Sequence, residues 1–107
     1  LSLDKKYINS MVSEYKRRRD LIVPKLNELG LPTLNPKGAF YTFSDISQYS
    51  KNSSEFSRKL INEAKVATIP GTEFGPFGEG YIRCSFATEY HKIEQALDRI
   101  EKFLKKK

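Results

Sequence analysis

A single arginine interrupts the segment of this chain that is most typical of a β-strand. From Tyr81 to Ala87 the side chains alternate between two faces, as they do in a strand that has one covered and one open side. One face carries Tyr81, Arg83 and Ser85, and the other carries Ile82, Cys84 and Phe86. A guanidinium among apolar neighbours is costly unless an anion pairs with it. The fold must therefore give Arg83 a partner or leave it exposed.

Two interpretations of Arg83 remain open at this point. Its rigid fork of parallel N–H donors suits a carboxylate or phosphate ligand in a way that the point charge of lysine does not. An internal ion pair with Asp45, Glu73 or Glu79, or an exposed position on an edge strand, would satisfy the same charge. Spacing alone does not decide between a ligand and a structural role.

The first third of the chain has the pattern of one long amphipathic helix. Between Asp4 and Leu29 the apolar residues recur at helical spacing, at Ile8, Val12, Tyr15, Ile22, Leu26 and Leu29. Because Pro24 lacks a backbone donor, we expect a kink or a restart near Asp20 to Val23. Gly30, which is free to adopt a positive φ, is expected to end the helix.

Two helices and three short strands are expected to follow. Strand character is found at residues 39–43, after a Lys37-Gly38 turn, at 66–69 and at 81–87. Ser53 to Glu55 are expected to cap a helix with a buried stripe of Phe56, Leu60, Ile61 and Ala64. The last helix begins near Thr88, with a stripe of Ile93, Ala96, Leu97, Ile100 and Leu104. This order predicts an α+β fold, with a small mixed or antiparallel sheet of three to four strands and helices packed on one face.

The charge balance suggests an alternative function. Lys and Arg outnumber Asp and Glu by 19 to 13, for a formal net charge of +6, which is compatible with a non-catalytic, basic α+β binding module. Much of the excess lies at Lys16 to Arg19 on the first helix and at Lys105 to Lys107, where a solvated helix face and a basic tail explain it. No aromatic residues alternate with these basic runs. We therefore expect no nucleic-acid partner.

Length and residue counts exclude several classes of protein. The 107 residues have room for a single domain, residues 1–107. With one cysteine and one histidine, the chain has neither an internal disulfide nor metal-ligand spacing, so no metal is expected; Cys84 is expected in the core and His91 at the surface. No apolar run approaches the ~20 residues of a membrane span, and no signal segment is seen. We expect a cytoplasmic location and no membrane partner.

Three linked motifs resemble one protein family. They are Asn35-Pro36-Lys37-Gly38-Ala39-Phe40-Tyr41, Pro70-Gly71-Thr72-Glu73-Phe74-Gly75 and Gly78-Glu79-Gly80-Tyr81-Ile82-Arg83-Cys84-Ser85-Phe86-Ala87. In their order and separations they resemble the C-terminal small domain of the class I and II aminotransferases of fold type I, similar to aspartate aminotransferase. Arg17 to Asp20 is similar to an Arg-Arg-Asp stretch on the helix that enters this domain in the family. The resemblance covers essentially the whole chain, with residues 1–29 as a long interdomain helix.

The resemblance implies a substrate-binding role for Arg83. In this family the arginine of the last strand motif binds the α-carboxylate of the amino acid or 2-oxo acid substrate, and Arg83 occupies that position. Phe40 matches a strand position that lines the substrate pocket in such enzymes, although an aromatic residue in a short strand is more often a core residue. The loop from Gly71 to Gly80 either shifts when substrate binds or is a purely structural turn.

The resemblance also implies what this chain lacks. The family binds pyridoxal 5'-phosphate mainly in a preceding large domain, whose cofactor lysine has a Ser-x-x-Lys setting that is absent here. It therefore implies no catalytic and no cofactor-binding residue in this chain, an inactive isolated fragment, and a full-length enzyme, usually a homodimer, that joins this domain to its own large domain. Within the family, the amino-acid sequence from Gly80 to Ala87 favours the aminotransferases that act on aspartate, alanine or aromatic substrates. The small domain of another fold type I pyridoxal-phosphate enzyme is the alternative.

Overall fold

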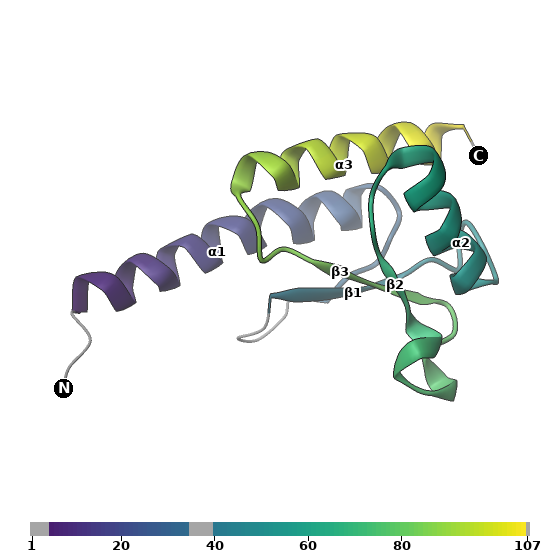
Figure 1. Ribbon diagram of the computed structural model, residues 1–107, viewed down its shortest axis with the longest axis horizontal. Helices are drawn as coiled ribbons and strands as arrows, with labels where there is room; N and C mark the ends of the chain where they lie inside the picture. Colours follow the sequence, from purple (N-terminus) through teal and green to yellow (C-terminus); the bar gives the residue numbers. More distant parts are fainter. Residues whose placement is uncertain (1–4, 35–39, 107) are drawn as a thin grey trace.

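The computed structural model describes residues 5–34 and 40–106 of the chain (Figure 1). A three-stranded antiparallel sheet, with strand order β1-β3-β2, is combined with three α-helices. The elements are α1 Lys5–Glu28, β1 Tyr41–Asp45, α2 Ser53–Lys59, the π-helical turn η1 Leu60–Ala64, β2 Ile69–Pro70, the 3-10 turns η2 Gly71–Phe74 and η3 Pro76–Gly78, β3 Tyr81–Ser85 and α3 Tyr90–Lys105. The predicted α+β fold and the predicted order of elements are confirmed.

Helix α1 continues through Pro24 as one element, so the restart allowed for near Asp20 to Val23 does not occur. Buried side chains on both sides of the proline, among them Val23 and Leu26, keep the backbone helical by packing into the core. The helix ends as predicted. Gly30 has φ +84°, and the N–H of the next residue, Leu31, donates to the carbonyl of Leu26 at 3.0 Å.

The fully buried side chains of α1 all lie in its C-terminal half, and Tyr15 packs against the edge of the core. Its first half extends past the sheet (Figure 1) and carries four exposed apolar side chains, Tyr7, Ile8, Met11 and Val12. The apolar stripe of this helix is therefore partly covered at Tyr15, buried from Ile22 to Leu26 and uncovered at its N-terminal end.

Helix α2 has a different cap from the one predicted. The side chain of Asn52 accepts a hydrogen bond from the backbone N–H of Glu55 at 3.0 Å, whereas Ser53 is buried and bonded elsewhere. The predicted stripe is buried at Phe56, Leu60 and Ala64. Ile61 is 49% exposed, contrary to expectation. Leu60 and Ala64 fill the inner side of this short turn and leave Ile61 on the outside.

Strand β3 forms the centre of the sheet, and its two faces differ as the alternation predicts. Ile82 and Cys84 are buried against the helices, while Tyr81 and Ser85 are exposed and Arg83 is partly exposed. Strand β1 begins at Tyr41, and Phe40, predicted as part of the strand, precedes it; the expected Lys37-Gly38 turn and Ala39 lie outside the described residues. Strand β2 is limited to Ile69–Pro70, so most of the strand predicted at residues 66–69 lies before it, with Val66 buried in the core.

Helix α3 lies beside α1 (Figure 1), and both contribute side chains to the core on the inner face of the sheet. Its buried residues are Ile93, Leu97, Ile100, Phe103 and Leu104, with Ala96 partly buried. Phe103 meets Phe56 of α2 edge-on, with ring centroids 5.7 Å apart. The helices thus fill one face of the sheet and leave the face that carries Arg83 open.

Candidate functional site

Arg83 projects from the middle of the central strand onto the open face of the sheet. Its backbone partners are Phe43 on β1 and Ile69 on β2, so the predicted edge-strand alternative is wrong. Within residues 5–34 and 40–106, no carboxylate oxygen lies within 4.0 Å of its guanidinium nitrogens. The arginine therefore has no charged partner in the described part of the domain.

The acidic residues considered as partners of Arg83 have other contacts. The carboxylate of Asp45 accepts a hydrogen bond from the backbone N–H of Ser47 at 2.8 Å, and hydrogen bonds from Ser47 lower the pKa of Asp45. Glu79 is bonded to Ser53 at the start of α2, and Glu73 makes no ion pair with the described residues. An internal ion pair of Arg83 is thus absent from the part of the chain that the structure covers.

Two aromatic rings flank the guanidinium of Arg83 in place of a carboxylate. Its Cζ atom lies over the ring of Tyr41, 4.2 Å from the centroid, and over the ring of Phe74, 4.4 Å from the centroid. Cation–π contacts at these distances are favourable and leave the N–H donors of the fork available. Alternation along β1 is a weak sequence signal for Tyr41, which lies on the open face of its strand with Phe43, whereas Phe74 lies in a loop and has no such signal.

The loop that carries Phe74 depends on a close approach of two glycines. A Cβ atom on Gly71 would collide with the backbone carbonyl of Gly78, and one on Gly78 would collide with that of Gly71. The loop consists of two consecutive 3-10 turns, η2 and η3, whose backbones approach each other closely at these two glycines. The ring of Phe74 also packs edge-on against Phe43, with centroids 5.8 Å apart.

Glu79 joins the far end of this loop to helix α2. Its carboxylate accepts hydrogen bonds from the Ser53 hydroxyl at 2.5 Å, from the Ser53 backbone N–H at 3.1 Å and from the Gly80 backbone N–H at 2.9 Å. The hydrogen bonds from Ser53, and then that from Gly80, lower the pKa of Glu79. The loop that positions Phe74 is thereby tied to the N-terminus of α2, which packs into the core through Phe56.

Phe40 belongs to a different cluster from Arg83. Its ring contacts Tyr15 of α1 and Phe86, with centroids 5.1 and 5.4 Å away, at the end of the sheet. Arg83 lies on the open face, between Tyr41 and Phe74. The structure therefore does not bring the two predicted substrate-binding residues into one cluster.

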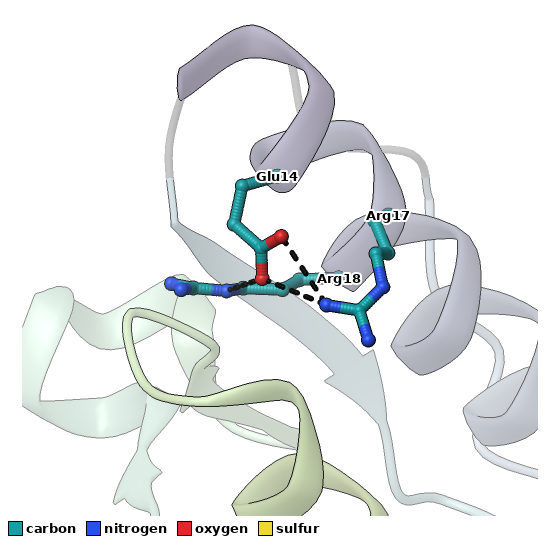
Figure 2. A network of polar contacts seen from close by, with 3 residues as sticks. All are labelled: Glu14, Arg17 and Arg18. Atoms are coloured by element: carbon teal, nitrogen blue, oxygen red, sulfur yellow. Dashed lines mark hydrogen bonds and ion pairs between the residues drawn. The ribbon is translucent and has the colours of Figure 1, made fainter. Parts of the chain in front are cut away.

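The basic cluster of α1 is paired internally. Figure 2 shows Arg17 and Arg18 converging on the carboxylate of Glu14, with nitrogen–oxygen distances of 3.1 and 2.9 Å. The hydrogen bond from Arg18, and then that from Arg17, lower the pKa of Glu14. Arg17 also lies over the ring of Tyr90, 3.9 Å from its centroid, and so connects α1 to the start of α3. These arginines contact the protein itself, which weakens the interpretation of a basic binding module.

Other candidates contribute little chemistry. Cys84 is buried, as predicted, and burial raises the pKa of its thiol to about 11. His91 is exposed on α3, also as predicted. In residues 5–34 and 40–106, no group of His, Cys, Asp or Glu side chains is arranged to bind a metal ion. None of the helices described there has the length and apolar character needed to span a bilayer.

Comparison with known proteins matches most of the chain, including the strand that carries Arg83, to one family. Residues 2–100 match the family description "Aminotransferase class I and II". The chain belongs to this family. It is 54% identical over 100 residues to an aromatic-amino-acid aminotransferase 2 of Thermococcus litoralis and 53% identical over 102 residues to an aspartate aminotransferase of Pyrococcus abyssi.

A solved structure supports the assignment of this chain to the aminotransferase family. The aromatic aminotransferase of Pyrococcus horikoshii OT3 superimposes with a TM-score of 0.90 at 50% identity, over 94% of this chain and 27% of the other. The sequence alignments to the Thermococcus and Pyrococcus abyssi relatives cover 94% and 95% of this chain and 26% of each relative. The chain thus spans about a quarter of the length of the relatives it matches.

We predict that Glu79→Gln lowers the free energy of unfolding of the aminotransferase domain at pH 7, and that the loss shrinks on acidification. A lowered folded pKa stabilises the domain above the unfolded glutamate value of about 4.3, and this stabilisation disappears as the pH falls through the folded pKa. Urea unfolding at pH 7 and at about pH 3 measures the difference. Glu73→Gln, in the same loop, is the control; an equal effect of Glu79→Gln at both pH values would contradict the prediction.

Proposed function

We propose that this chain is the C-terminal small domain of a pyridoxal-phosphate-dependent aminotransferase and that Arg83 binds the α-carboxylate of its substrate. The single observation that carries the proposal is a guanidinium on the open face of the sheet with no carboxylate partner in the described residues. The family assignment supports it, because an aminotransferase must bind an anionic amino acid or 2-oxo acid. A bidentate arginine is the side chain best suited to that ligand.

The contribution of Arg83 to the reaction is binding and orientation. Two parallel N–H donors fix both oxygens of a carboxylate, and so fix the direction in which the Cα–H bond points. Because Arg83 extends from a central strand, its backbone is held on both sides by β1 and β2. Arg83 therefore extends from the strand of the sheet that is paired on both sides. In this proposal the fixed position of that strand sets the orientation of the bound substrate.

The described lysines do not fit a site for pyridoxal 5'-phosphate. A Schiff base needs a lysine beside the substrate, yet the strands around Arg83 read Tyr-Thr-Phe-Ser-Asp, Ile-Pro and Tyr-Ile-Arg-Cys-Ser. Lys25, Lys59 and Lys102 form ion pairs with carboxylates on the helices. We therefore assign cofactor binding to the remainder of the full-length enzyme.

We propose two further contacts for this domain in the full-length enzyme. The ring of Phe40 lines a shallow groove with Met11, Val12 and Tyr15, and we assign it to the border of the substrate pocket. The exposed apolar side chains on the first half of α1 are assigned to the contact with the enzyme's own large domain. The structure of the full-length enzyme with bound substrate tests both contacts directly.

Replacing Arg83 tests the proposed function. In the full-length enzyme, Arg83→Leu should lower kcat/KM for the amino acid by about 100-fold or more, because a charged, bidentate pair is lost. Arg83→Lys should recover part of the activity, since it restores the charge without the fork. Arg99→Leu, at an exposed arginine of α3, is the matched control. Wild-type steady-state kinetics in Arg83→Leu would remove this residue from the site.

The cofactor assignment has a separate test. The isolated 107-residue chain, mixed with pyridoxal 5'-phosphate, an amino acid and a 2-oxo acid, should transfer amino groups no faster than the free cofactor does. The reason is that none of the three described strands carries a lysine, and that Lys25 and Lys102 are paired with carboxylates on the helices. Turnover above the free-cofactor rate that a single Lys→Ala change abolishes would show that this chain carries the cofactor lysine.

A further inference from the structure

We infer that Tyr41 and Phe74 are positioning residues that hold the Arg83 guanidinium for the substrate carboxylate. The inference rests on the proposed function of Arg83 and adds two residues to its site. It begins from the two ring contacts of the guanidinium, 4.2 Å to the centroid of Tyr41 and 4.4 Å to that of Phe74.

The two rings come from different parts of the chain. Tyr41 is the first residue of β1 and is paired with Ser85, so it lies diagonally across from Arg83 on the same open face. Phe74 is the last residue of the turn η2, which directly follows the edge strand β2 in the chain. Contacts from a strand and from a loop thus meet at one guanidinium, which confines a side chain that is otherwise long and flexible.

The position of Phe74 is itself supported by two features. Its ring packs edge-on on Phe43, the direct cross-strand partner of Arg83, with an interplanar angle of 82°. The turn that carries it is held by the backbone contact of Gly71 with Gly78, which leaves no room for a side chain at either position. The loop is therefore built to present a ring at this place over the sheet.

Aromatic partners have a consequence that a carboxylate partner would not have. A protein carboxylate would neutralise the guanidinium and compete with the substrate for the same N–H donors. A ring offers its π face and accepts no conventional hydrogen bond, so the charge and the fork stay available while the guanidinium is kept in place. Tyr41 and Phe74 thus allow a preorganised arginine that remains open to an anion.

The test uses the full-length enzyme and four variants. Tyr41→Leu and Phe74→Leu remove a ring, while Tyr41→Phe and Phe74→Tyr retain it. Each leucine variant should raise KM for the amino acid by about 3- to 30-fold with a smaller fall in kcat, and the ring-retaining variants should stay within about twofold of the wild type. Competitive inhibition by the α-carboxamide of the same amino acid, which lacks the negative charge, should change little in any variant.

The outcomes distinguish this inference from the proposed function. Phe77→Leu removes a 96% exposed ring from the same loop and should not change the preference for the acid over its amide. If Arg83→Leu abolishes that preference while the leucine variants at 41 and 74 keep it, the inference fails and the proposed function stands. If the leucine variants weaken acid and amide equally, the rings are merely structural and the inference also fails. If Arg83→Leu itself keeps the preference, both fail.

Discussion

The charge of Arg83 on the open face of the sheet is the constraint on which the rest of this domain depends. A guanidinium in the middle of a central strand would be costly if apolar groups covered it without an anion. The described residues supply two aromatic rings and no carboxylate, so the side chain is confined and its donors are free. The proposed substrate carboxylate would supply the anion that the described residues do not.

The surrounding fold keeps this arrangement in place. On the inner face, α1 and α3 bury the apolar side of β3, which fixes the strand and therefore the direction of Arg83. On the outer side, the Gly71–Gly78 contact and the hydrogen bonds of Glu79 to the start of α2 fix the loop that carries Phe74. Core packing and loop hydrogen bonding thus both act on the position of Arg83 and of the rings beside it.

The sequence was sufficient to predict the order of the helices and strands and the face of β3 that carries Arg83, and insufficient where tertiary contacts decide the structure. Alternation along β3 predicts which side chains face the helices, because a strand has a fixed period of two. It does not predict that α2 is capped by Asn52 in place of the following serines, nor that α1 passes through Pro24, since both depend on packing. The role of Phe74 could not be predicted either, because a loop residue has no periodicity and its place depends on the close backbone contact of Gly71 with Gly78.

The most direct measurement is a crystal structure of the full-length enzyme with a bound amino acid or 2-oxo acid. The account predicts that both oxygens of the α-carboxylate lie about 2.7–2.9 Å from two guanidinium nitrogens of Arg83, with the rings of Tyr41 and Phe74 still beside that guanidinium. A carboxylate bound by another group, with Arg83 paired to an acidic residue from the remainder of the enzyme, would contradict it.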